Sequence, residues 1–103
     1  YVGIADALRS RIEQHLVRRA SSVTTNTAAV GLNPDYVTEV RWWCHVGFGE
    51  RAFLEAAELV AFDVLQPCLR SRGRIEAGAK VLYAQESFQA EMRVLLASEP
   101  AGR

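Results

Sequence analysis

The stretch from Glu50 to Gln66 constrains the fold most, because it carries the strongest helical pattern in the chain. Its apolar residues recur every three or four positions, which places them along one side of a helix. They are Phe53, Leu54, Ala57, Val60, Ala61, Val64 and Leu65. The proline at position 67 disfavours helical backbone at the residue before it. We therefore predict a long amphipathic helix that ends at Pro67 and packs its apolar side into a core.

Two other stretches are predicted to be strands. The segment Tyr36 to His45 is dense in β-branched and aromatic residues, and an extended backbone would place Val40, Trp42 and Cys44 on one face. The segment Tyr1 to Ile4 is too short to stand alone, so we interpret it as the end of a longer hairpin.

The rest of the chain is predicted to be helix and loop. Apolar residues at four-residue spacing predict a helix from about Ala7 to Arg19. The stretch from Ala20 to Asp35 is rich in Ser, Thr, Asn, Ala and Gly, which indicates a long loop. After Gly73, one or two amphipathic helices are expected to cover the sheet.

Length and composition bound the class of protein. A chain of 103 residues supplies one small domain with one core. Half of the residues are hydrophobic and 23% are charged, which argues for a packed globular protein rather than a disordered one. No apolar run approaches the roughly 20 residues of a membrane span, and no secretory leader is recognisable, so we expect a cytoplasmic protein without a membrane partner.

The two cysteines do not indicate a disulfide scaffold or a zinc cluster. Cys44 and Cys68 lie on separate predicted elements, and there is no second pair of cysteines. His45 follows Cys44 directly, but consecutive strand residues point to opposite faces. No ligand pair or nucleophile is therefore predicted at these two positions.

The charged residues leave the partner open. The formal net charge is zero, which counts against binding of a polyanion. The cations are nearly all arginine, whose planar fork suits phosphate, and they cluster along the chain. Alternatively, these arginines are scattered over solvated faces. The two clusters are Arg9, Arg11, Arg18 and Arg19, and then Arg70, Arg72 and Arg74.

Glu58 is the anomaly of the helix that ends at Pro67. Its neighbours one helical turn away are Leu54, Ala61 and Phe62, so its carboxylate is expected among apolar side chains. Burial of an unpaired charge is expensive, which favours a cation or a metal ion beside it. Alternatively, the carboxylate lies at an edge, where it reaches water or pairs with an arginine. The other acidic residues of this helix have more evident routes to water: Glu50, Glu55 and Asp63.

The order and spacing of four elements resemble the second half of the GIY-YIG nuclease signature. Tyr1-Val2-Gly3 is followed ten residues after its tyrosine by Arg11, then by His15, and far downstream Glu58 precedes Pro67 by nine positions. In that family a strand with the YIG tyrosine leads into a helix with an invariant arginine, and a later helix presents a metal-binding glutamate shortly before a proline. The resemblance spans roughly residues 1 to 69.

The resemblance implies an α/β (α+β) fold with a small three-stranded sheet flanked by helices. Residues 1–72 would form a GIY-YIG-like nuclease core, and residues 73–103 a C-terminal helical extension of the same domain. Two departures from the family pattern stand out. The upstream GIY strand is absent from this chain, and Arg70 stands where the family usually has an asparagine.

The activity that the resemblance implies is hydrolysis of DNA phosphodiester bonds by a Mg²⁺- or Mn²⁺-dependent endonuclease. Glu58 would hold the metal ion, and Arg11 would stabilise charge that develops on the phosphate. Tyr1 would orient or deprotonate the attacking water, and His15 would assist proton transfer. The arginines expected to contact DNA are Arg9, Arg18, Arg70 and Arg72.

Two other hypotheses remain open at this point. The first is a catalytically inactive GIY-YIG-like module that binds nucleic acid or a protein partner, suggested by the zero net charge, the missing strand and Arg70. The second is a helical interaction domain in which the motif occurs by chance. The absence of a strand over Tyr36 to His45 would favour the second hypothesis.

Overall fold

The computed structural model describes residues 1–17, 33–69 and 74–102. The described elements are mostly helical. Two short helical turns and a π-helix accompany four α-helices, in the order α1 (Leu8–Ile12), η1 (Glu13–Val17), η2 (Pro34–Tyr36), η3 (Val46–Gly49), α2 (Arg51–Leu65), α3 (Ala77–Tyr83) and α4 (Glu86–Ala97).

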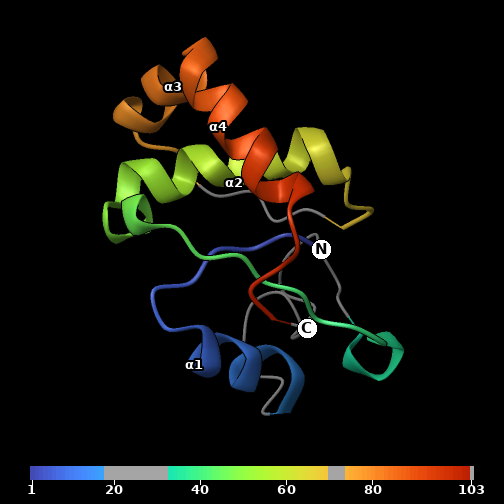
Figure 1. The fold of residues 1–103 in the computed structure, drawn as a ribbon. Coiled ribbons are helices and arrows are strands. Elements are labelled where there is room, and N and C mark those ends of the chain that lie inside the picture. The colour runs from blue at the N-terminus through green and yellow to red at the C-terminus, as the bar shows by residue number, and fades with distance from the viewer. Residues whose placement is uncertain (18–32, 70–73, 103) are drawn as a thin grey trace.

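Helix α2 lies at the centre of the molecule (Figure 1). Helices α3 and α4 pack on one side of it, and the extended segments lie on its other side, with α1 beyond them. The C-terminal tail leaves α4 and crosses to the half that holds the extended segments. No described helix is long and apolar enough to cross a lipid bilayer.

The predicted helix over residues 50–66 is confirmed as α2, and its apolar side forms the core. Small residues let the first turn of α3 come close, since a Cβ built on Gly78 would lie 3.5 Å from the Cβ of Ala52. Larger residues of α4 then fill the space beside α2. The buried cluster consists of Ala56, Ala57, Val60, Ala79, Phe88 and Met92.

Helix α2 ends one residue earlier than its pattern suggested. Gln66 adopts left-handed backbone angles, with φ 45° and ψ 61°, and its N–H still donates to the carbonyl of Phe62 at 3.1 Å. Pro67 follows directly and makes helical angles at Gln66 unfavourable. The prediction that the proline at position 67 ends this helix is therefore confirmed.

The predicted three-stranded sheet is wrong, because the described residues contain no strand. The predicted strand at Tyr1 to Ile4 is irregular backbone. Over Tyr36 to His45, the first residue belongs to η2 and the rest form an extended segment with a single bridge, between Trp42 and Gly102. The residues that the structure describes therefore do not form the GIY-YIG-like α/β fold, and α3 and α4 cover α2 instead of a sheet.

The N-terminal helical prediction is only partly met. Helix α1 ends at Ile12 and continues as the π-helix η1 to Val17, while the predicted last residues, Arg18 and Arg19, lie outside the described residues. Most of the loop predicted over residues 20–35 lies outside them as well. Its described end forms η2, where the Asn33 side chain accepts the N–H of Asp35 at 3.0 Å.

Candidate functional site

The residues predicted to form a nuclease site lie on separate parts of the molecule. The Tyr1 ring lies over Gly3 in the N-terminal segment, Arg11 is exposed on α1, and Glu58 is half-buried on α2. Helices α1 and α2 do not contact each other (Figure 1). Arg11 and Glu58 are therefore not brought together on one phosphate-sized site in this structure.

The other predicted site residues, as far as the structure describes them, do not complete such a site. Arg9 is exposed on α1, and the backbone of His15 belongs to η1. The His15 side chain and the whole of Arg18, Arg70 and Arg72 lie outside the described residues. Within the described part of the chain, no three His, Cys, Asp or Glu residues group as a metal site would require. The Mg²⁺ or Mn²⁺ centre at Glu58 stays a prediction.

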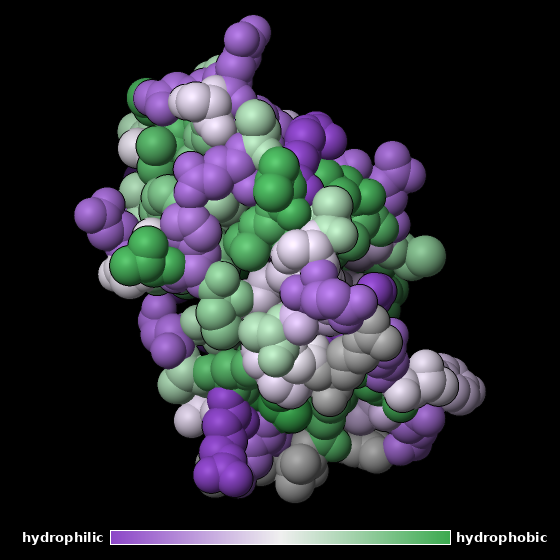
Figure 2. Space-filling model, viewed as in Figure 1, coloured by the Kyte–Doolittle hydropathy of each residue, from purple (hydrophilic) through white to green (hydrophobic). Residues whose placement is uncertain are grey.

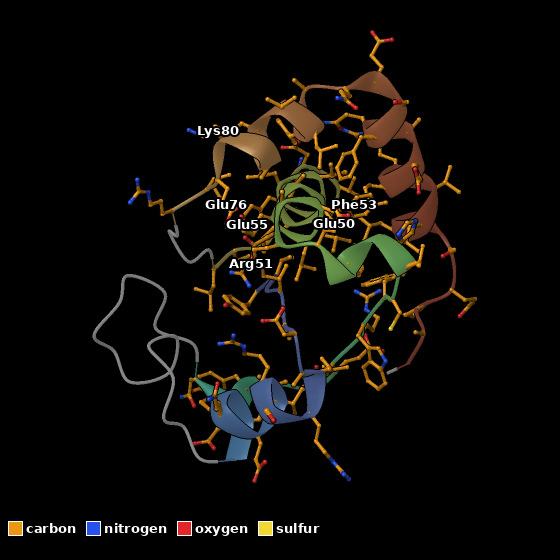
Figure 3. The ribbon with its side chains drawn as sticks, turned by 90° about the vertical axis from the view of Figure 1, so that its left-hand side faces the viewer. Glu50, Arg51, Phe53, Glu55, Glu76 and Lys80 are labelled. Atoms are coloured by element: carbon orange, nitrogen blue, oxygen red, sulfur yellow. The ribbon has the colours of Figure 1, made fainter. Side chains whose placement is uncertain are left out.

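Among the described residues, the most buried charged group is Glu55, three residues before Glu58 on α2. Only 5% of Glu55 is exposed, although its sequence position suggested a route to water. Its Oε1 lies 3.9 Å from the Arg51 Nε, beyond hydrogen-bond length, and its Oε2 has no hydrogen-bond partner. Figure 3 shows Arg51 and Glu55 on one side of α2, near Glu76 and Lys80, with Phe53 on the other side. The buried carboxylate therefore costs the fold stability.

Glu58 is a second carboxylate of α2 that is removed from water, although it is less buried than Glu55. Burial raises the pKa of its carboxyl, the Arg51 guanidinium lowers it, and the Glu55 carboxylate raises it again. Burial is the largest of these three causes. The expectation of a carboxylate among apolar side chains is thus met in part, and the cation that acts on it is an arginine of the same helix, Arg51.

This raised pKa predicts how stability changes with pH when Glu58 is replaced. The native state holds the Glu58 proton more tightly than the unfolded chain does, so protonation of Glu58 stabilises the native state. This contribution is fully present below the ordinary glutamate pKa of 4.5. It is lost as pH rises through the raised native pKa. We therefore expect Glu58→Gln, which cannot ionise, to be more stable than the wild type at neutral pH. The advantage should shrink in acid.

Urea unfolding at acidic and neutral pH measures this difference. Glu50→Gln is the matched control, because Glu50 is an exposed carboxylate at the start of the same helix. A Glu58→Gln variant that is less stable than the wild type at neutral pH would show that the ionised carboxylate has a favourable partner.

His45 has a defined place that the sequence pattern did not reveal. Its Nδ1 accepts the N–H of Gly47 at 2.9 Å, so the ring proton sits on Nε2, which donates to the Glu91 Oε1 at 2.7 Å. The ring stacks on Phe53 with centroids 5.0 Å apart. Both ring nitrogens are occupied, so His45 fastens η3 to α4 and is not free to act as a base.

The extended segment from Val37 to Cys44 has the side-chain order of a strand. Glu39 and Arg41 lie on the same face, because the Arg41 Nε is 3.3 Å from the Glu39 Oε1. The Arg41 guanidinium also lies over the Trp43 ring, 6.0 Å from its centroid. The side chains of residues 39, 41 and 43 thus lie on one face, as they would in a strand. The described residues do not form the ladder of backbone hydrogen bonds that would make a sheet.

The C-terminal tail pairs with this segment at one residue. The Trp42 N–H donates to the Gly102 carbonyl at 3.1 Å, and the Ala101 N–H donates to the Trp42 carbonyl at 2.7 Å. Gly102 lies so close to the Trp42 indole that a Cβ there would come within 1.9 Å of the ring. The Trp43 Nε1 adds a hydrogen bond to the Ser98 carbonyl at 3.3 Å. The tail therefore pairs with the segment through one antiparallel bridge at Trp42.

A shallow surface hollow lies at the start of α3. Two basic residues, one acidic residue and two apolar ones line it, and it is open to solvent. They are Arg74, Ile75, Glu76, Ala77 and Lys80. No nucleophile with an adjacent base is present among these lining residues, so the hollow has no catalytic set of its own.

Comparison of the chain with protein-family models, with curated proteins and with solved structures gave no match. The resemblance to GIY-YIG nucleases therefore rests on the residues that carry it, and the function is argued from the geometry above.

Proposed function

We propose that this chain is an interaction module that binds an extended polypeptide along the segment Val37–Cys44. The observation that carries the proposal is an extended backbone with one side unused. None of the backbone hydrogen bonds between described residues involves Glu39, Arg41 or Trp43, and the opposite side of the segment is used at Trp42 alone, by the C-terminal tail. We call the backbone N–H and C=O groups of these three residues the free edge.

An unpaired strand edge is a template for another strand. A polypeptide that lies along it gains main-chain hydrogen bonds, and the alternating side chains give specificity. Two strongly exposed apolar residues flank the segment, Tyr36 at 83% and Val46 at 96%. Figure 2 shows apolar patches between hydrophilic residues on one face of the molecule. Such patches favour contacts with protein over contacts with a polyanion.

The same observations weaken the support for an endonuclease. That hypothesis needed a sheet to hold the tyrosine beside the arginine and the glutamate, and no described residue forms a strand. The hypothesis of a helical interaction domain with a chance motif expected no strand over Tyr36 to His45. We therefore give binding the priority and keep cleavage as the rival.

Peptide selection against the full chain tests the proposed function. We expect selected peptides to shift the backbone amide resonances of Glu39, Arg41 and Trp43 in NMR spectra. Arg41→Pro, which removes one N–H of the free edge, should weaken their binding by about tenfold or more. Thr38→Pro is the matched control, because residue 38 faces the other edge by strand alternation. Peptides that instead shift only the amides of α2, α3 and α4 would contradict the proposal.

A plasmid-nicking assay with Mg²⁺ or Mn²⁺ tests the rival. We expect no metal-dependent nicking by the wild type. Nicking that disappears in both Arg11→Ala and Glu58→Ala would establish the endonuclease and overturn the proposed function.

A further inference from the structure

We propose that the free edge is occupied by a second copy of this chain, in an antiparallel pairing centred on Val40. This inference rests on the proposed function and names its partner. It is argued from which edge is open and from the charges along it.

The edge assignment follows from strand geometry. The N–H and C=O groups of one extended residue point to the same side, and those of its neighbours point to the opposite side. Trp42 uses both groups toward the C-terminal tail. Glu39, Arg41 and Trp43 therefore present their groups on the opposite side, so the tail and a second copy do not compete for the same edge.

The charges along this edge are self-complementary. When two copies run antiparallel about Val40, Glu39 of one copy lies opposite Arg41 of the second copy, and the reverse pair forms on the other side of the two-fold axis. Glu39 and Arg41 already share one face within the chain, where their side chains lie 3.3 Å apart and about half exposed. Opposite charges placed directly across two strands stabilise the pairing.

A neighbouring register lacks this complementarity. If the pairing were centred on Arg41 instead, Arg41 would lie opposite its own copy, which places like charges directly across the two strands. The centre at Val40 also places Val40 opposite itself, and β-branched residues favour such a position. The charge pattern thus selects one partner and one register.

Charge reversal tests both together. We expect the wild type to form a dimer with a Kd on the order of 100 µM in sedimentation experiments, since a single pair of strands gives weak association. Each single variant, Glu39→Arg or Arg41→Glu, should weaken dimerisation by about tenfold or more, because both cross-strand pairs become repulsive. Arg93→Glu is the matched control for Arg41→Glu, because it makes the same change in net charge on the exposed face of α4.

Two further combinations restore the pairing. A mixture of Glu39→Arg with Arg41→Glu should form a heterodimer, because each copy now carries one sign of charge. The double variant E39R/R41E should dimerise like the wild type, because its charges are exchanged and not lost.

A wild type that stays monomeric up to about 1 mM overturns this inference. Peptide binding at the free edge would then still support the proposed function, so the two failures are distinguishable. A dimer that is unaffected by the single charge reversals also overturns the inference, because it would form through another surface.

Discussion

Phe88→Ala is expected to lower the free energy of unfolding by about 3–5 kcal/mol. Phe88 is 4% exposed on α4 and meets Phe53 of α2 edge-on, with centroids 5.0 Å apart and rings 80° to each other. The variant loses the buried surface of the ring, leaves a cavity, and forfeits an aromatic pair worth about 0.5–1.5 kcal/mol. Because small domains have about 5–15 kcal/mol of stability in total, about a fifth or more of it should be lost.

Urea unfolding followed by circular dichroism measures this loss. Val94→Ala is the matched control, because Val94 lies on the same helix but is 72% exposed, and its variant should stay within about 0.5 kcal/mol of the wild type. A Phe88→Ala variant as stable as the Val94→Ala control would show that α4 does not pack on α2 as described.

The contrast between α2 and the extended segment shows how much of this fold the sequence could predict. Helical hydrogen bonds join residues four apart, so the apolar spacing within residues 50–66 and the proline at 67 contain the whole signal. A strand needs a partner elsewhere in the chain. The pattern over Tyr36 to His45 predicted a strand, and this prediction is wrong, because the pattern contains nothing about whether a neighbour pairs with the segment. Among the described residues, the segment pairs with a neighbour through the bridge from Trp42 to Gly102 alone.

The candidate site was predictable to a smaller extent. Helical neighbours placed Glu58 among apolar residues, and its raised pKa agrees with partial burial. The same reasoning assigned Glu55 to the water side, because one helix cannot show what packs beside it. His45 was dismissed because its position next to Cys44 was judged along the chain, whereas its actual partner, Glu91, is 46 residues away. Contacts between distant segments decided both outcomes.

Glu55→Met is expected to raise the free energy of unfolding by about 1–3 kcal/mol. The carboxylate Oε2 is buried without a hydrogen-bond partner, and the Arg51 Nε stays 3.9 Å from Oε1. A buried polar oxygen without a partner costs stability, whereas methionine fills a similar volume without a polar oxygen. Thermal and urea unfolding of the purified variant measure the gain.

Two comparisons are needed to interpret the stability of the Glu55→Met variant. Glu50→Met changes an exposed glutamate of the same helix start and should leave stability within about 0.5 kcal/mol. If Glu55→Met instead destabilises the protein by several kcal/mol, the carboxylate belongs to a favourable charge pair, since removal of one member of a buried charge pair costs about 3–5 kcal/mol. If the variant is more stable, Glu55 is retained at a cost to the fold. Because Glu55 is not part of the free edge, the variant should then dimerise like the wild type, and the two properties can be measured separately on one protein.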